Sequence, residues 1–257
     1  MLSDILLFFP VQDDSGDAVG KICWYDGENL GILYIVATPI GNLDDITMRA
    51  LEVLRSVDVI ACEDTRRTLG LLNRFSISKR LISCRSHNER YGAGKIVGFL
   101  KEKKDIAFVS DAGTPGLSDP GGLLVSIVRK NGFRVIPIPG ASALAAILSV
   151  SGVGGRSVTF DGFLSPKPGK RRKRLKELAD RRENFVLYES PNRLIKLIRD
   201  LVEICPERDI LVGKEMTKKF EEYFTGIPDV VLGILEQKAS IKGEYSIHVS
   251  GKKYSTL

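Results

Sequence analysis

The stretch VSDAGTPGLSDPGG, residues 109–122, sets how the chain around it is interpreted. An apolar run ends at Val109, and Asp111 then opens a loop rich in glycine and proline. Glycine leaves backbone N–H groups open to a ligand, and ligands of open α/β sheets bind beyond the carboxyl ends of the strands. The stretch therefore predicts a strand, a binding loop and a helix that starts at Asp119 and Pro120. A tight turn that Asp111 only caps is the alternative.

Two further loops have the same character. VATPIGNLDD (residues 36–45) and PIPGASAL (residues 137–144) each follow an apolar run typical of a strand. Three such loops would meet at one rim of a sheet, which favours a ligand site over unrelated turns. The chain contains neither G-x-G-x-x-G nor G-x-x-x-x-G-K-[ST], so the ordinary dinucleotide and P-loop sites are excluded.

The alternation of short apolar runs with helical periods predicts an α/β fold. Over residues 31–150 this pattern indicates a mostly parallel N-terminal sheet with helices on both faces. The glycine-rich segment SGVGGRS, residues 151–157, marks the boundary. Over residues 156–257 the rhythm changes, which predicts a smaller mixed-sheet α/β domain with some antiparallel pairing.

Residues 1–30 fit neither domain, because they are rich in turn formers and carry no strong period. They are interpreted as a mobile extension or as sequence upstream of the true start. No apolar run approaches the roughly 20 residues that span a bilayer, and ILLFF is too short for a signal peptide. Four scattered cysteines predict reduced thiols in a cytoplasmic protein. With only two histidines, we expect no metal site. With no run long enough to span a bilayer, we expect no membrane partner.

The positive charge of the chain is concentrated in residues 165–182, here called the basic block. It contains nine lysines and arginines and two acids, a balance of +7, while the rest of the chain carries −1. Such a concentration favours a polyanion over a merely solvated face. The block begins as a Pro/Gly loop and enters a helix, which predicts a mobile cationic arm that follows phosphates. The residues expected to contact RNA are Lys167, Lys170, Arg171, Arg172, Lys173 and Arg174.

The order of the motifs matches a known family. The chain resembles the tetrapyrrole methylase superfamily and, within it, the ribosomal RNA small subunit methyltransferase I group. The resemblance runs from about residue 31 to residue 252. It is carried by LYIVATPIGNLDDIT (33–47), CEDTR (62–66), HNE (87–89), SDAGTPGLSDPG (110–121), PIPGASA (137–143), DGFLSPK (161–167), YESPNR (188–193), KEMTKKFEEYFTG (214–226) and KGEYSIHV (242–249).

This resemblance implies a homodimer of two-domain subunits with S-adenosyl-L-methionine bound between the domains. It implies methyl transfer to the 2′-oxygen of a cytidine in 16S rRNA, at the decoding centre of the small ribosomal subunit. The residues implied to bind the cofactor are Pro39, Gly41, Asp111, Ala112, Gly113, Leu117, Ser118, Ala141, Ser142, Ala143 and Tyr188.

Methyl transfer to a ribose hydroxyl requires alignment and a base for a weakly acidic proton. His87 is a candidate base by residue type, and its alternative is a structural histidine beside Asn88 as a helix cap. Glu63 and Asp64 are rival catalytic residues, and Arg66 beside them can clamp an RNA phosphate. The same three residues could instead form a buried ion-pair network at a subunit interface.

Two other functions are weighed against the rRNA methyltransferase. A tetrapyrrole methyltransferase of the precorrin or uroporphyrinogen type needs a cleft wide enough for a macrocycle and gives no reason for the basic block. A non-enzymatic RNA-binding protein would carry damaged cofactor loops, yet all three loops are intact.

Overall fold

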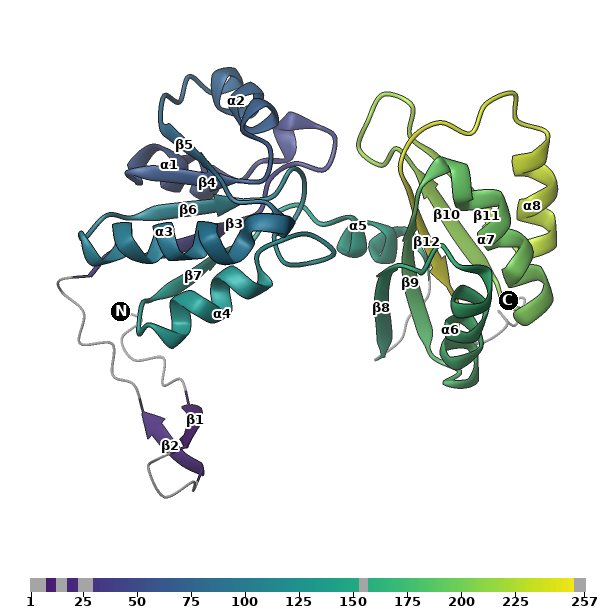
Figure 1. Cartoon of the computed structure of the whole chain (residues 1–257). Helices are drawn as coiled ribbons and strands as arrows, with labels where there is room; N and C mark the ends of the chain where they lie inside the picture. The colour runs from purple at the N-terminus through teal and green to yellow at the C-terminus, as the bar shows by residue number, and fades with distance from the viewer. Residues whose placement is uncertain (1–7, 13–17, 23–29, 153–156, 252–257) are drawn as a thin grey trace.

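The computed structural model describes residues 8–12, 18–22, 30–152 and 157–251. Two five-stranded sheets organise the chain (Figure 1). The first has the order β5-β4-β6-β3-β7, and all of its pairs are parallel. Its strands are β3 (Leu33–Val36), β4 (Val59–Cys62), β5 (Arg80–Ser83), β6 (Ile106–Val109) and β7 (Val135–Ile138).

Helices cover both faces of this first sheet, because its central strands are buried on both sides. Phe108 packs with helices α3 and α4, whereas its neighbour Val109 packs with α1 and α2. Successive side chains of a strand point to opposite faces, so the continuous apolar run of β6 serves both layers. The helices are α1 (Met48–Ser56), α2 (Thr65–Arg74), α3 (Glu89–Lys101) and α4 (Gly122–Lys130), with 3-10 turns at Leu43–Asp45 and Ser86–Asn88.

The second sheet is mixed and has the order β11-β10-β12-β9-β8. Only the β8–β9 pair is parallel among its described pairs. Its strands are β8 (Val158–Phe163), β9 (Asn184–Glu189), β10 (Ile210–Lys214), β11 (Glu222–Gly226) and β12 (Tyr245–Val249). The helices of this half are α6 (Pro168–Asp180), α7 (Pro191–Ile204) and α8 (Pro228–Glu236).

Helix α5 (Ala143–Val150) connects the two halves. It follows β7 of the first sheet, and Figure 1 shows it between the two sheets. Its Ile147 is fully buried against Val186, Leu211 and Met216, on the face of the second sheet opposite to α6, α7 and α8. The second sheet is therefore covered on both faces, and the loops after β3, β6 and β7 lie on its side of the first sheet.

The α/β class, the parallel first sheet and the mixed second sheet are as the sequence predicts. In the N-terminal residues, strands β1 (Phe8–Gln12) and β2 (Ala18–Ile22) form an antiparallel pair, and the interpretation of residues 1–30 as a mobile extension or upstream sequence stays a prediction. Residues 1–7, 13–17 and 23–29 lie outside the described residues, as do 153–156 of the predicted boundary. Among the helices that the structure describes, none combines the length and apolar character needed to cross a membrane.

The predicted start of α4 is wrong. The helix begins at Gly122 and not at Asp119–Pro120. Glu89, at the first turn of α3, accepts hydrogen bonds at Oε1 from the N–H groups of Gly121 (2.9 Å) and Leu124 (3.0 Å). A carboxylate from another helix thus satisfies the first amide groups of α4, which leaves Asp119 in the preceding loop.

Candidate active site

A cavity of about 400 Å³ opens between the two halves of the chain. This volume lies within the usual range for small-molecule and cofactor sites. Eight of the residues predicted to bind the cofactor line it: Asp111, Ala112, Gly113, Leu117, Ser118, Ser142, Ala143 and Tyr188. Gly243 and Glu244, just before β12, also line it from the second half.

Three residues of the predicted cofactor set do not line this cavity. Gly41 lines a neighbouring depression with Thr217, whose Oγ1 accepts a hydrogen bond from the N–H of Asn42 at 3.1 Å. The carbonyl of Ala141 accepts from Thr114 Oγ1 at 3.2 Å. Pro39 lies beside the cavity-lining Ile40. The loop of residues 39–42 therefore contacts the second half of the chain at the edge of the cavity.

The glycine-rich loop after β6 is fixed by backbone contacts. Gly113 and Thr38 exchange two hydrogen bonds, each of 2.9 Å, which join this loop to the one after β3. Gly113 has φ 74° and a Cβ there would stand 3.3 Å from Ile40, so glycine suits both the conformation and the space. Ser118 also has a positive φ, of 67°, and presents the following Asp119 to the cavity.

The cavity is lined by more acidic than basic side chains. Its carboxylates are Glu63, Asp111, Asp119, Glu189 and Glu244, and its cationic side chains are Arg67 and Lys218. Three of the carboxylates have cations beside them: Arg67 lies 3.6 Å from Asp111, Lys218 lies 2.9 Å from Glu244, and Arg193 lies 2.7 Å from Glu189. The surplus of negative charge suits a cationic ligand.

Asp119 differs from these carboxylates because no ion pair or hydrogen bond engages its side chain among the described residues. Desolvation and, after it, the charges of the neighbouring Glu63, Asp111 and Glu244 carboxylates together raise its pKa from 3.8 to about 6. Desolvation and Asp111 also raise the pKa of Glu63. The sequence indicates Asp119 only as the start of a helix. Its place in a glycine-rich loop after a strand is the signal that could have identified it as a residue of the site.

Aromatic rings form one wall of the cavity. Tyr188 makes edge contacts with Phe160 and Phe163, at centroid distances of 4.9 and 5.8 Å. Burial raises the pKa of the Tyr188 hydroxyl to about 12, so this side chain is neutral at physiological pH. The wall is apolar and lies opposite the loops that follow β6 and β7.

Of the three predicted catalytic residues, Glu63 alone lines the cavity. Glu63 lines the cavity, whereas His87 is exposed on the 3-10 turn and lines a separate depression with Tyr91. Asn88 stands at the predicted N-cap position of α3, but its side chain accepts a hydrogen bond from the N–H of Arg85 (2.8 Å) and makes no capping bond to the helix. The structure thus gives Glu63, and not His87, access to the cavity.

Asp64 and Arg66 form a pair outside the cavity. The Asp64 carboxylate caps α2 by accepting from the Arg66 N–H at 2.9 Å and pairs with the Arg66 guanidinium at 3.0 Å. These bonds lower the pKa of Asp64 to about 2. The Arg66 side chain is 87% exposed in the single chain, and a buried network of these residues at a subunit interface stays a prediction.

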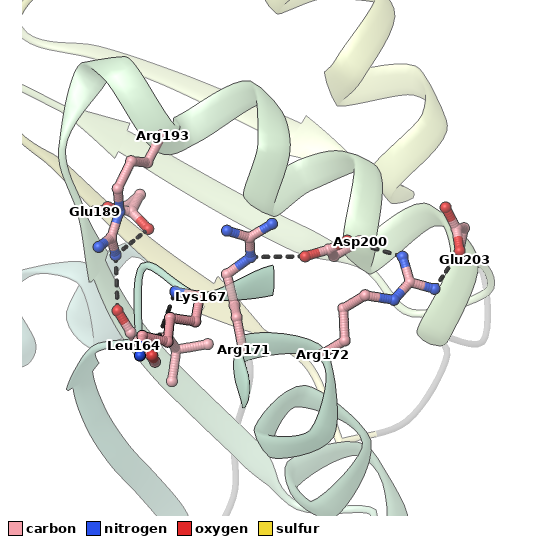
Figure 2. Close-up of polar contacts among 9 residues, drawn as sticks. Leu164, Lys167, Arg171, Arg172, Glu189, Arg193, Asp200 and Glu203 are labelled. Atoms are coloured by element: carbon pink, nitrogen blue, oxygen red, sulfur yellow. Dashed lines mark hydrogen bonds and ion pairs between the residues drawn. The ribbon is translucent and has the colours of Figure 1, made fainter. Parts of the chain in front are cut away.

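The basic block is an ordered part of the fold, and the expectation of a mobile arm is wrong for residues 168–180, which form α6. Arg171 is buried and donates to Asp200 at 2.7 Å, while Arg172 donates to Asp200 at 2.9 Å and also to Glu203 (Figure 2). Arg174 donates hydrogen bonds to the Asp161 carboxylate from both Nε and Nη2. Asp161, Asp200 and Glu203 lie outside the block in sequence and neutralise part of its charge, so its local surplus is smaller than +7.

These pairs separate the arginines predicted to contact RNA, which have acidic partners, from the lysines, which have none among the described residues. Arg171 is removed from the set, because its guanidinium is buried on Asp200. Arg172 and Arg174 are partly exposed but engaged by acidic partners. Lys167, Lys170 and Lys173 are exposed and form no ion pair among the described residues.

Residues 32–227 match the family of tetrapyrrole (corrin/porphyrin) methylases, and the chain belongs to this family. Among its relatives are proteins named ribosomal RNA small subunit methyltransferase I. The protein of that name from Borrelia garinii subsp. bavariensis is 48% identical over 220 residues, which cover 85% of this chain and 98% of the relative. The Thermotoga maritima protein is 44% identical over 87% of this chain and 100% of its own length. The Bacillus subtilis protein is 42% identical over 87% of this chain and 76% of its own length.

Solved structures with the same fold are tetrapyrrole methyltransferases. The uroporphyrin III C-methyl transferase from Thermus thermophilus has a TM-score of 0.62 at 16% identity, covering 86% of this chain and 97% of its own. A second structure of this enzyme, complexed with S-adenyl homocysteine, has a TM-score of 0.61 at 16% identity with the same coverage. At these identities the likeness establishes the fold.

Proposed function

We propose that this protein is an S-adenosylmethionine-dependent methyltransferase that methylates the 2′-oxygen of a cytidine in 16S rRNA, at the decoding centre of the small ribosomal subunit. The observation that carries the proposal is the acidic cavity at the carboxyl ends of the first sheet, in a chain 40–48% identical to curated small-subunit rRNA methyltransferases. The proposal includes a homodimer, whose mass light scattering would measure.

The residues of the cavity fit this cofactor. S-adenosylmethionine carries a positively charged sulfonium centre, which activates the methyl group for displacement when the cofactor is bound. Asp111 and Glu63 supply negative charge at the loops of the first half. The α5 N-terminus offers backbone N–H groups at Ser142 and Ala143, where the Ser142 side chain makes no capping bond. The apolar part of the cofactor would lie along Leu117 and Tyr188.

The proton of the ribose hydroxyl goes to Asp119 in this proposal. A base must be ionised at working pH and still basic enough to accept a proton, and a pKa of about 6 satisfies both conditions. Its side chain faces the cavity without a cation that would lower its basicity. The negative charge of Glu63 repels the ionised form of Asp119 and so helps to keep the pKa of Asp119 high. His87, outside the cavity, has no direct part in the reaction.

The RNA would be held by exposed cations outside the cavity. Lys167, Lys170 and Lys173 come from α6 and the residue before it, and Arg66 comes from α2. Exposed lysines and arginines bind phosphates without reading sequence. This division, with a surplus of acids in the cavity and exposed cations outside it, suits a cationic cofactor and a polyanionic substrate in the same protein.

The acceptor is tested by a direct comparison. Purified protein is incubated with radiolabelled S-adenosylmethionine and either undermethylated small ribosomal subunits or uroporphyrinogen III. Label in the RNA alone supports the proposal. Label in the tetrapyrrole alone replaces it with the alternative enzyme, and cofactor-independent RNA binding without any transfer replaces it with a non-enzymatic RNA-binding protein.

A further inference from the structure

The exposed Phe163 owes its position to a bulge in β8. In the pairing of β8 with β9, Phe160 lies opposite Val186, Gly162 opposite Leu187 and Phe163 opposite Tyr188, with a register shift between Phe160 and Gly162. Side chains of a regular strand alternate between faces, so residues 160 and 163 would point to opposite sides. The extra residue, Asp161, brings both rings to the same face, where both contact Tyr188.

The backbone on each side of Phe163 is held in place. On one side, Asp161 accepts from Arg174 at 2.6–3.1 Å, and Gly162 has φ 60° with the Ser118 side chain filling the space of a Cβ. On the other side, the carbonyl of Leu164 accepts from Arg193 Nη2 at 2.8 Å.

Arg193 is itself fixed by the buried Glu189, to which it donates hydrogen bonds of 2.7 Å from both Nε and Nη2 (Figure 2). Two arginines, one from α6 and one from α7, therefore lock the strand end that carries Phe163. Because the backbone is already fixed, it loses little conformational entropy when a ligand binds there, and such preorganisation favours tight binding.

The ring of Phe163 is nevertheless open to solvent. Phe163 lines the cavity and is 58% exposed. The chain continues from it to Lys167 and Lys170 at the start of α6, which are exposed and form no ion pair with any residue that the structure describes. A rigid aromatic face beside free cations is the arrangement with which proteins bind unpaired nucleotides, because the base stacks on the ring while the cations hold the backbone.

We propose that Phe163 is the stacking platform for an unpaired base of the substrate RNA at the mouth of the cavity. The inference rests on the proposed function and names how the same site receives its RNA. Arg174, which the sequence assigned to RNA contact, acts instead as a positioning residue that fixes the bulge at Asp161.

The test compares F163A, F163W and F163L by steady-state methylation of undermethylated small subunits and by separate titration of S-adenosylmethionine. Loss of one base–aromatic stack is expected to raise the KM for subunits about 5- to 100-fold in F163A. F163W should retain wild-type KM, F163L should lie near F163A, and all three should bind the cofactor as wild type does. Y91A, which removes an exposed aromatic ring from outside the cavity, is the matched control.

Unchanged KM in F163A overturns the inference, as does weaker cofactor binding with unchanged KM for subunits, which would assign the ring to the cofactor. The affinity of each variant for a single-stranded oligocytidylate, measured by filter binding, provides a readout without turnover. If the wild type does not methylate subunits, the proposed function is contradicted. The oligonucleotide affinities of F163A and F163W then still decide the role of the ring.

Discussion

At the scale of single residues, charge coupling distinguishes Asp119 from the other acids of the cavity. Its carboxylate feels the negative charges of Glu63, Asp111 and Glu244, and no cation in the described part of the chain pairs with it. Each neighbour disfavours a further negative charge, and burial acts in the same direction. A carboxylate in such a place is a better proton acceptor than one that is paired with arginine.

We expect D119N to lower kcat about 10²- to 10⁴-fold, because an amide cannot accept the proton. In the wild type, kcat/KM should rise with pH around a midpoint of about 6, and D119N should lose this dependence. D229N, which changes an exposed aspartate on α8, is the control. Full activity of D119N with the wild-type pH profile would exclude Asp119 as the base.

The same residue makes a prediction for stability. Because the folded-state pKa of Asp119 is raised from 3.8 to about 6, the folded state binds its proton more tightly than the unfolded state does. Its contribution to the free energy of unfolding is therefore present at low pH and declines as pH rises towards 6. D119N should be more stable than the wild type above that pH in urea denaturation.

His248 gives the opposite pH dependence. It is buried under α5 with Nε2 unpartnered among the described residues, and burial lowers its pKa from 6.5 to about 4. The unfolded state then binds the proton more readily, so stability is lost as pH falls from 6.5 towards 4. Between these values the free energy of unfolding should fall by about 1.4 kcal/mol per pH unit through this residue. H248L should reduce that slope, and an unchanged slope would contradict the assignment.

At the scale of elements, α6 combines two groups of cations with different roles. The buried Arg171–Asp200 pair joins α6 to α7, while Lys167, Lys170 and Lys173 face solvent. Breaking a buried pair from one side leaves an uncompensated charge and typically costs about 3–5 kcal/mol. Exposed, unpaired lysines contribute little to stability and are available to phosphates.

Two variants separate these roles. D200N should lower the free energy of unfolding by about 3–5 kcal/mol, because it removes the carboxylate charge from Arg171 and Arg172.

The triple variant K167A/K170A/K173A should remain as stable as the wild type but bind subunits more weakly. Its plot of log affinity against log salt should have a slope smaller by about 2, for three lost phosphate contacts. An unchanged salt slope would remove these lysines from the RNA surface.

Local patterns predicted the elements well, and contacts between distant residues account for what they missed. The apolar runs and helical periods predict the strands and helices of the parallel sheet, because these patterns depend only on residues that are close in sequence. The cap of α4 comes from Glu89, 32 residues before Gly121, and Arg171 pairs with Asp200, 29 residues away. A count of charges along the chain therefore overstated the free charge of the basic block.

Within the site, family motifs predicted eight cavity-lining cofactor residues, but sequence alone could not separate ligand contacts from contacts between the halves. Gly41 illustrates this: a Cβ there would stand 2.4 Å from Cγ of Lys218 and 2.7 Å from Oγ1 of Thr217. Its glycine is required by close approach to the second half of the chain. The bulge that turns Phe163 to the cavity has no local signature beyond Gly162.

At the scale of the whole molecule, the site exists only where the two halves meet. The first half supplies Asp111 and Asp119 from the loop after β6, and the second half supplies Tyr188 and Phe163 from the ends of β9 and β8. The Thr217–Asn42 hydrogen bond joins the halves beside the cavity. Three of the five cavity carboxylates, Glu63, Asp111 and Asp119, come from the first half, and the second half presents the aromatic ring and the lysines proposed for RNA.

The most direct test of this account locates the methyl group in the product. Undermethylated small subunits are labelled by the wild-type protein with radioactive S-adenosylmethionine, and the RNA is hydrolysed with alkali. A 2′-O-methyl group blocks cleavage at its nucleotide, so the account predicts label in an alkali-resistant dinucleotide, and none with D119N at equal reaction time. Label released in mononucleotides would show methylation of a base and contradict the central claim.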